Sequence, residues 1–224
     1  MKAIVFDLDG TLIDSAPDIR AAINRTLLDE GHAPLDLAEV ISFIGHGLPN
    51  LVARAMGVRG IDAHEHARLT AVTLAHYNAA SNDLTQPYPG AIAALEALRA
   101  AGHVLGLCTN KPEAPARKVL AQFGMAHLFD VVVGGDSLPT RKPDPAPLRH
   151  AFAALDAHGV QAALYIGDSE VDAETAQAAG IPFGFFTQGY CHIRHDAVPQ
   201  AWRFDHFDAL PGLVAQHAPI APDR

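Results

Sequence analysis

The sequence contains no apolar run of the roughly 18 residues that a membrane-spanning helix requires. Its first residues lead directly into an apolar, strand-like segment, without the basic and apolar regions of a secretion signal. Cysteine is scarce, and Cys108 and Cys191 form neither a disulfide framework nor a CxxC metal or redox pair. These absences predict a cytoplasmic protein that has no membrane partner.

Basic residues are also scarce, because 16 Lys and Arg stand against 25 Asp and Glu, which gives a formal net charge of −9. No basic block could release counterions from phosphates, so we expect no nucleic-acid partner. Any anionic ligand must be held locally, by a metal ion or a few placed cations. The 49% of hydrophobic residues and the lack of low-complexity tracts indicate a folded chain with a well-buried core.

Apolar segments and helical patterns alternate along most of the chain. This alternation predicts an α/β fold, with a Rossmann-like, mostly parallel sheet and helices on both of its faces. Ligands of such sheets bind at the carboxyl ends of the strands. The predicted strands are 2–8, 103–109, 130–135, 162–168 and 181–187, and the predicted helices between the later strands are 90–101, 113–123, 145–158 and 170–179.

The stretch from 16 to 84 departs from this alternation and shows helical patterns only. It is too long for a simple crossover, and its polar faces do not suit another layer of the core. We therefore expect a small helical cap domain inserted after the first strand, with "DSAP" and "TQPYPG" as hinges. The predicted domains are a core of 1–15 and 85–224 and a cap of 16–84.

Polar residues stand at the carboxyl ends of the predicted strands. The first strand delivers Asp7 and Asp9, which side-chain alternation places on the same side of the sheet edge. The other candidates are Thr109 and Asn110 immediately before a helix, Lys142 in "TRKPDP", and Asp168 followed by Ser169 and Asp172. Separate strands thus direct several acids, a threonine and a lysine toward one edge.

Crowded carboxylates are unfavourable unless a cation or proton is shared among them, so the acids suggest a hard divalent metal ion. Mg²⁺ fits best, held by Asp7, Asp168 and a backbone carbonyl, which we expect to be that of Asp9. Asp7 could then attack a phosphoryl group, while Asp9 serves as general acid and then as general base. Thr109 would offer its hydroxyl and nearby backbone N–H groups to the phosphate.

The segments "DLDGT", "CTNK", "RKPDP" and "GDSEVD" resemble the four motifs of the haloacid dehalogenase superfamily. The layout with a helical insert after the first strand is similar to members that carry a helical cap. Within the superfamily, the chain most resembles the phosphoglycolate phosphatases, through "FDLDGTLIDSAPDI", "CTNKPEAPA", "GGDSLPTRKPDPAPL" and "GDSEVDAETA".

This resemblance implies a Mg²⁺-dependent hydrolase of small phosphorylated metabolites, with 2-phosphoglycolate as substrate and an aspartyl-phosphate intermediate. It also implies a role for each matching residue. The expected roles are nucleophile for Asp7, acid and base for Asp9, phosphate binding for Thr109, Asn110 and Lys142, metal binding for Asp7, Asp9 and Asp168, and support for Thr11, Ser169 and Asp172.

Each motif taken alone has a structural alternative. A calcium loop starting at Asp7 is excluded, because Leu12 and Asp18 stand where that loop needs Gly and Glu. Thr109 alone would be a helix N-cap, and Lys142 alone would be a solvated loop lysine. Asp172 could merely decorate the first turn of a helix, where negative charge is favoured.

The "GHG" segment at 45–47 also has two interpretations. It could be a break between two helices, with Gly45 ending one of them. Alternatively, Gly45, His46 and Gly47 bind substrate, because the family places a cap loop over the active site and glycines allow a close backbone approach. The N–H groups of this loop would then meet a negatively charged group of the substrate, with Arg20, Arg25 and Arg54 of the insert as candidate helpers.

The thirteen histidines and Cys108 suggest other chemistry at first sight. Neither "HEH" (64–66) nor "CHIRH" (191–195) has the spacing of a zinc site, so a solvated surface is the favoured interpretation. Alternation points Cys108 away from Thr109, into the packing of the sheet, which disfavours it as a nucleophile.

Several rival functions remain to be weighed. A phosphatase of another small metabolite and a phosphosugar mutase would use the same core residues. A dehalogenase would need neither Asp9 nor a metal, and a phosphonoacetaldehyde hydrolase needs a cap lysine, which 15–85 lacks. A receiver-type module needs fewer residues and no insert, and a non-catalytic phosphate-binding module has little use for Asp9 beside Asp7. We expect a monomer or a homodimer.

Overall fold

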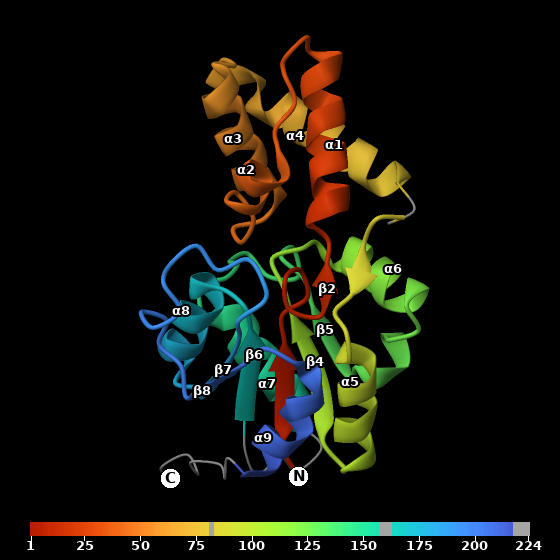
Figure 1. Cartoon of the computed structure of the whole chain (residues 1–224), viewed down its shortest axis with the longest axis vertical. Coiled ribbons are helices and arrows are strands. Elements are labelled where there is room, and N and C mark those ends of the chain that lie inside the picture. Colours follow the sequence, from red (N-terminus) through yellow and green to blue (C-terminus); the bar gives the residue numbers. More distant parts are fainter. Residues whose placement is uncertain (81–82, 157–162, 217–224) are drawn as a thin grey trace. The chain divides into compact units, whose positions relative to one another are not determined.

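The computed structural model describes residues 1–80, 83–156 and 163–216. Its main feature is a six-stranded sheet in which all neighbouring strands run parallel, in the order β5-β4-β1-β6-β7-β8 (Figure 1). The strands are β1 (Ala3–Phe6), β4 (Val104–Cys108), β5 (Val131–Val133), β6 (Ala163–Gly167), β7 (Phe183–Phe186) and β8 (Trp202–Phe204). The predicted α/β fold with a parallel sheet is confirmed.

The edge strand β8 was not predicted from the sequence. It has only three residues, and the exposed Arg203 separates the buried Trp202 and Phe204. The one apolar–polar–apolar alternation in these residues is too short to distinguish a strand from a loop.

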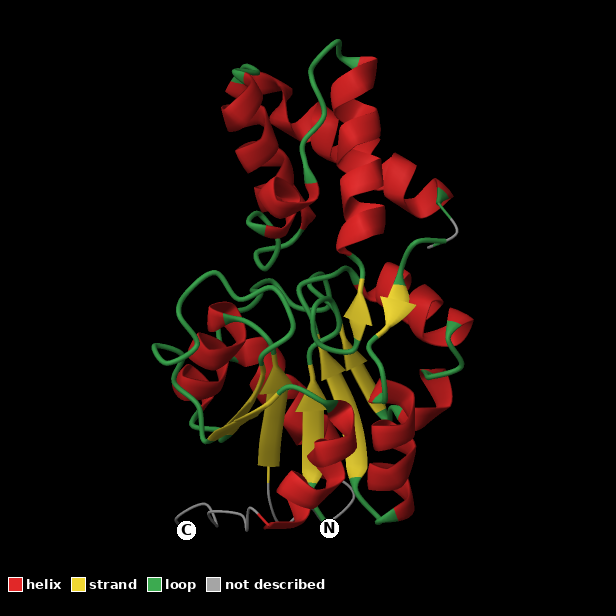
Figure 2. Ribbon diagram, viewed as in Figure 1, coloured by secondary structure: helices red, strands yellow, loops and turns green. Residues whose placement is uncertain are grey.

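Helices cover both faces of the sheet, as Figure 2 shows. Side chains of a strand alternate between the two faces, so Ile4 and Phe6 pack on one side and Ala3 and Val5 on the other. The first side carries α5 (Ala91–Ala100), α6 (Glu113–Gln122) and α9 (Leu210–Gln216), and the second carries α7 (Ala146–Asp156) and α8 (Glu170–Ala179). Short 3₁₀ turns lie at η2 (Ala126–Leu128) and η3 (Phe207–Ala209).

Most of the predicted elements differ from the observed ones by one to three residues at their ends. The exact helix prediction is 170–179, where Ser169 caps the N-terminus and Gly180 ends the helix in the left-handed conformation. Two predictions extend beyond the described part of the chain: residues 157–158 of the helix at 145–158 and residue 162 of the strand at 162–168.

The chain divides into two compact units, one formed by Met1–Ile13 with Pro87–Arg224 and one by Asp14–Gln86. The boundaries expected from the sequence differ from these by two residues. Where the chain passes from one unit to the other, β2 (Ile13–Asp14) and β3 (Gln86–Pro87) pair as a small two-stranded sheet. The sequence predicted hinges at these positions but no strands.

Between β2 and β3, the regular elements among the described residues of the second unit are all helical. Its elements are α1 (Ala16–Asp29), α2 (Leu37–Ile41), α3 (Leu48–Arg59), the 3₁₀ turn η1 (Ala63–Glu65) and α4 (His66–Ala79). The buried Asp18 near the start of α1 accepts hydrogen bonds from Leu84 N and from Thr85 N and Oγ1, which joins the two ends of the unit. Across the described residues, no helix is both long and apolar enough to cross a bilayer.

Candidate active site

The site is built where the central strands of the sheet end. Asp7 follows β1 directly, and its backbone N–H donates to Ile166 O of β6, at 2.9 Å. Thr109 follows β4 in the same way, with its N–H donating to Val133 O of β5 at 3.0 Å. Because β1 lies between β4 and β6, their carboxyl ends bring Asp7, Thr109 and Asp168 to one edge of the sheet.

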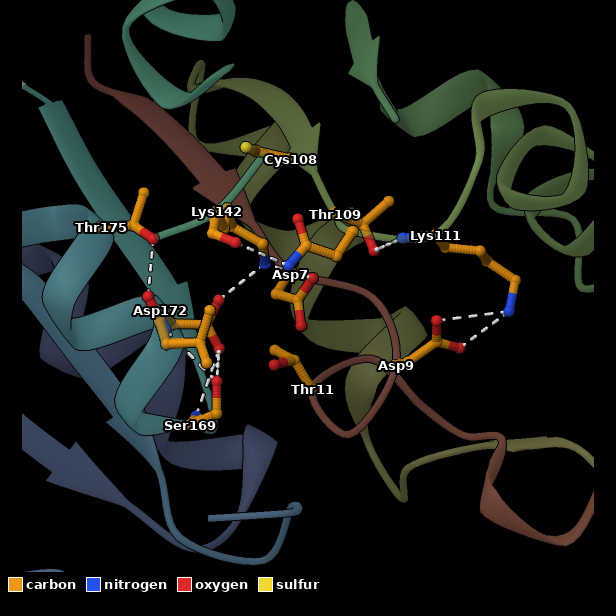
Figure 3. A network of polar contacts seen from close by, with 12 residues as sticks. Asp7, Asp9, Thr11, Cys108, Thr109, Lys111, Lys142, Ser169, Asp172 and Thr175 are labelled. Carbon is orange, nitrogen blue, oxygen red and sulfur yellow. Dashed lines mark hydrogen bonds and ion pairs between the residues drawn. The ribbon is translucent and has the colours of Figure 1, made fainter. Parts of the chain in front are cut away.

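Lys142 is the buried centre of this edge and is only 3% exposed. Its Nζ donates to Asp7 Oδ1 at 2.8 Å and to Asp172 Oδ1 at 2.7 Å (Figure 3). It also donates to the Tyr165 hydroxyl at 2.9 Å. An ammonium group has three N–H donors, so these three acceptors use all of them. The solvated loop lysine considered from the sequence is therefore excluded.

The charges around Lys142 set its protonation. Burial by itself lowers the pKa of Lys142, but the carboxylates of Asp172 and Asp7 outweigh this effect and hold the pKa above its ordinary value. The ammonium form is therefore the stable one at this edge of the sheet.

Asp7, Asp168 and Asp172 are buried and can each direct a carboxylate oxygen to within 4.8 Å of the others. Burial raises the pKa of Asp7 to about 7, although Lys142 opposes the shift. Burial also raises the pKa of Asp168 well above its usual range, and the charges of Asp172 and Asp7 add to the effect. Such crowding favours a shared cation, and carboxylate oxygens are the donors that hard divalent ions prefer. The cluster could therefore hold a metal ion.

The loop after β1 fixes Asp168. Thr11 Oγ1 donates to Asp168 Oδ1 at 2.6 Å, and Tyr190 N donates to Asp168 Oδ2 at 2.6 Å. Gly10 has φ of 91°, and a Cβ on it would lie 2.4 Å from Asp168 Oδ2. The "DGT" segment thus needs glycine for both its conformation and its close approach.

Asp9 does not follow the alternation expected from the sequence. β1 ends at Phe6, and the chain then turns, with the N–H groups of Leu12 and Ile13 both donating to Leu8 O. The strand argument for placing Asp7 and Asp9 on one side was therefore wrong. Figure 3 shows Asp9 directed away from Asp7, toward Lys111. Lys111 Nζ contacts Asp9 Oδ1 at 3.0 Å and Oδ2 at 3.3 Å.

Thr109 and Asn110 are buried in the loop between β4 and α6. The prediction that they stand immediately before a helix was wrong, because α6 begins at Glu113 with Pro112 as its N-cap. Thr109 is therefore no helix cap, and its Oγ1 instead accepts from the N–H of Lys111 at 3.2 Å. Asn110 Nδ2 donates to the backbone oxygen of Lys142 at 3.0 Å.

Asp172 satisfies both interpretations that the sequence left open. It forms a capping box with Ser169 at the start of α8, so it does occupy the first turn of a helix. Its Oδ2 accepts from Ser169 Oγ at 2.6 Å, while its Oδ1 faces Lys142. One carboxylate thus starts the helix and joins the acidic cluster.

Sequence reasoning missed two residues of this site, Lys111 and Tyr165. The Tyr165 hydroxyl contacts both Lys142 Nζ and Asp172 Oδ1, the latter at 2.7 Å. A tyrosine within the apolar segment "AALYIGD" was the available signal, because a buried hydroxyl needs a partner. For Lys111 the signal was its position in "CTNK", immediately after two candidate phosphate ligands.

In the second unit, Gly47 caps the N-terminus of α3, with φ of 81°, and Gly45 has φ of 122°. The alternative in which Gly45 ends a helix is wrong, because α2 ends at Ile41 with Ser42 as its C-cap. His46 is exposed between the two glycines. The backbone of this loop is thus unusual, whereas its predicted role in substrate binding stays a prediction.

The other residues considered from the sequence have structural partners. His64 contacts Asp62 and Glu65, and His192 contacts Glu170. Cys108 is fully buried on the α7 and α8 side of the sheet, and burial raises the pKa of its thiol to about 12. A thiol with such a pKa is a poor nucleophile.

Comparison with known proteins identifies the class to which this fold and site belong. Residues 4–186 match the family described as haloacid dehalogenase-like hydrolase, and the chain belongs to this family. It is 53% identical to a phosphoglycolate phosphatase of Cereibacter sphaeroides over 96% of this chain and 98% of that protein. It is 45% identical to a phosphoglycolate phosphatase of Rhodobacter capsulatus, covering 95% and 96% of the two chains.

The solved structures that resemble this chain include a predicted phosphoglycolate phosphatase from Haemophilus somnus. The two structures align with a TM-score of 0.88 at 32% identity, over 96% of this chain and 98% of the other. The expected membership of the haloacid dehalogenase superfamily is therefore confirmed, and its phosphoglycolate phosphatases are among the relatives.

Proposed function

We propose that this protein is a Mg²⁺-dependent phosphomonoester hydrolase whose substrate is 2-phosphoglycolate. The observation that carries the proposal is the buried arrangement of Asp7, Lys142, Asp168 and Asp172 at the end of β1 and β6. The names of the relatives from Cereibacter sphaeroides and Rhodobacter capsulatus support the choice of substrate.

In the first half-reaction, a carboxylate oxygen of Asp7 attacks the phosphorus atom, and the bond from phosphorus to the leaving oxygen breaks. Asp9 gives its proton to that oxygen, so that glycolate leaves with a neutral hydroxyl group. Lys142 neutralises charge on Asp7 and on the transferring phosphoryl oxygens. To donate to phosphate, it must release one of its three present acceptors.

In the second half-reaction, a water molecule attacks the phosphorus of the aspartyl phosphate. Asp9 takes a proton from this water, and the bond between phosphorus and the Asp7 oxygen breaks. Asp7 is thereby restored as a carboxylate, and inorganic phosphate is released. The Thr109 hydroxyl and the Asn110 side chain would hold the phosphate during both steps, since both are buried at the end of β4.

Asp7, Asp168 and the backbone carbonyl of Asp9 would hold the Mg²⁺ ion, with Asp172 as a neighbour. When bound, Mg²⁺ would supply positive charge that stabilises the crowded carboxylates and neutralises the phosphoryl oxygens. The acidic cluster supports this proposal, because its donors are all hard oxygen atoms. Lys142, which contacts Asp7 and Asp172, offsets only one of the three carboxylates.

The test is a metal-dependent assay of phosphate release from 2-phosphoglycolate, glucose 6-phosphate, glycerol phosphate and a generic aryl phosphate. We expect activity that requires Mg²⁺ and the highest kcat/KM for 2-phosphoglycolate. A sugar phosphate as best substrate would overturn the choice of substrate, and isomerisation of a sugar phosphate would indicate a mutase. No turnover of any phosphomonoester would overturn the proposed chemistry itself.

A further inference from the structure

The chain has four lysines, Lys2, Lys111, Lys118 and Lys142, and two of them lie at the candidate active site. Lys142 donates hydrogen bonds to Asp7 and Asp172 and has a role in the proposed mechanism, whereas Lys111 has none so far. Lys111 is only 8% exposed, and lysine is rarely buried without a specific partner. Its presence at the edge of the sheet therefore calls for a chemical explanation.

Lys111 and Asp9 form an ion pair that is nearly buried. Its Nζ reaches both carboxylate oxygens, and the two side chains are 5% and 14% exposed. Figure 3 shows this pair on one side of Asp7, with Lys142 and Asp172 on the other. The two buried lysines thus flank the proposed nucleophile from opposite sides.

The backbone of Lys111 is held firmly. Its carbonyl accepts from Gly135 N at 2.8 Å, and its N–H donates to Thr109 Oγ1 at 3.2 Å. A Cβ on Gly135 would lie 2.3 Å from Asn110 O, so only glycine lets the two loops approach this closely. The charged end of Lys111 therefore projects from a fixed point two residues beyond Thr109.

We propose that Lys111 binds the carboxylate of the substrate, and that this carboxylate replaces Asp9 as its partner. The inference rests on the proposed function, in which Asp9 donates to the leaving oxygen. In 2-phosphoglycolate only one methylene separates that oxygen from the carboxylate. A group that contacts Asp9 therefore also lies close to the carboxylate of a substrate that Asp9 serves.

The exchange couples recognition to catalysis. While Lys111 holds both oxygens of Asp9, that side chain is turned away from Asp7. A substrate carboxylate that takes over Lys111 frees Asp9 to turn toward the leaving oxygen. A phosphate ester without a carboxylate leaves the ion pair in place, so it loses both a binding contact and the release of the acid.

The arginines of the second unit, considered from the sequence, are weaker candidates for this role. Arg25 pairs with Asp29, and its side chain is 67% exposed. Arg54 donates to Ser42 O and stacks over Phe43, while Arg20 is exposed. Because water screens exposed charges, none of them matches the nearly buried ammonium group of Lys111.

The experiment compares two substrates of the same shape, 2-phosphoglycolate and 2-phosphoglycolamide, in which a neutral amide replaces the carboxylate. The variants are Lys111→Met, Lys111→Arg and, as a matched control on an exposed face of α6, Lys118→Met. We expect Lys111→Met to lower kcat/KM for 2-phosphoglycolate by ~100-fold or more, since a buried charge pair is lost. For the amide we expect no loss, since no substrate charge is left unpaired and Lys111 no longer holds Asp9.

Lys111→Arg should restore most of the preference for the charged substrate, and Lys118→Met should preserve the preference in full. Inhibition by glycolate should weaken in Lys111→Met, which reports binding without turnover. Equal losses for both substrates would overturn the inference, because Lys111 would then act on Asp9 or on the fold alone. In that case continued metal-dependent hydrolysis would leave the proposed function standing. If the unchanged protein hydrolyses neither substrate nor an aryl phosphate, both proposals are wrong.

Discussion

The two units of this protein use charged side chains in different surroundings. In the first unit, Lys142 meets Asp7 and Asp172 at the end of the strands, and its side chain is 3% exposed. In the second, Arg68 meets Glu30 and Glu65 at similar distances, but its side chain is 51% exposed. The contacts look alike, and only burial separates them.

That difference indicates what each set of charges does. An exposed ion pair adds little to stability, because water and salt screen it. A buried set such as Asp7, Asp168 and Asp172 is costly to desolvate, so stability is a poor explanation for it. Strongly shifted pKa values in a buried cluster are instead typical of functional sites. Substitutions in the two sets of charges should therefore differ in their effects on activity and on stability.

The largest effect is expected from Asp7→Asn. The amide cannot attack phosphorus and binds a metal ion weakly, so kcat should fall by at least ~10⁴-fold. The fold should persist, because the change removes one of three crowded negative charges. Steady-state phosphate release and circular dichroism measure the two effects. Activity within about tenfold of the unchanged protein, a loss of only ~1.4 kcal/mol, would rule out Asp7 as nucleophile.

Asp9→Asn should have the next largest effect. If Asp9 protonates the leaving oxygen and later activates water, both half-reactions slow, typically by about 10²- to 10⁴-fold. An aryl phosphate, whose leaving group needs less protonation, should lose less in the first step than an alkyl phosphate. Rapid-quench measurement of each step provides the comparison. Equal losses for the two substrates would contradict the acid role.

Among the described residues of the second unit, Asp18 departs from this pattern, since this acid is only 3% exposed. Asp18→Ala would leave Leu84 N and both donors of Thr85 without their acceptor, so the free energy of unfolding should fall by about 2–4 kcal/mol. Asp18→Asn retains one oxygen acceptor and should cost less. Urea unfolding measures both variants, and equal stability of Asp18→Ala and the unchanged protein would show that these bonds contribute nothing.

Tyr165→Phe tests the buried hydroxyl that sequence reasoning missed. Removing it leaves Lys142 without one acceptor and Asp172 without one donor, so we expect kcat to fall about tenfold, with KM changed far less. Tyr88→Phe is the matched control, because its hydroxyl makes an exposed 3.3 Å contact to Gln188 O, away from Lys142 and Asp172. A similar change of kcat in both variants would show that the Tyr165 hydroxyl does not position Lys142.

The features that could be predicted from the sequence are those that depend on residues close together in the chain or on the general geometry of parallel sheets. The strand at Ala3–Phe6 and the helix at Glu170–Ala179 depend on local apolar runs and caps, and both were predictable. Asp7, Lys142 and Asp168 were found because parallel strands end at the same edge of a sheet. These predictions needed no knowledge of individual contacts.

The parts that could not be predicted depend on contacts between distant residues. The Lys111–Asp9 pair joins positions 102 apart in the chain, and the Lys142–Tyr165 bond joins positions 23 apart. Nothing in the local pattern states which lysine meets which acid. The direction of the Asp9 side chain likewise depends on where β1 ends, and the boundaries of elements are the least certain part of a sequence prediction.

The smallest effect is expected from Arg68→Met, which removes the exposed counterpart of the buried lysine network. Arg68 donates to both oxygens of Glu30 at 2.8 Å, so its hydrogen bonds are about as short as those of Lys142. Because its side chain is half exposed, we expect kcat to change by less than about twofold and the midpoint of urea unfolding to stay unchanged within error. The same measurements at low and high salt should agree closely. A clear loss of stability at low salt that disappears at high salt would mean that the ion pairs of Arg68 stabilise the second unit. Burial would then not explain the difference between these exposed ion pairs and the buried contacts of Lys142.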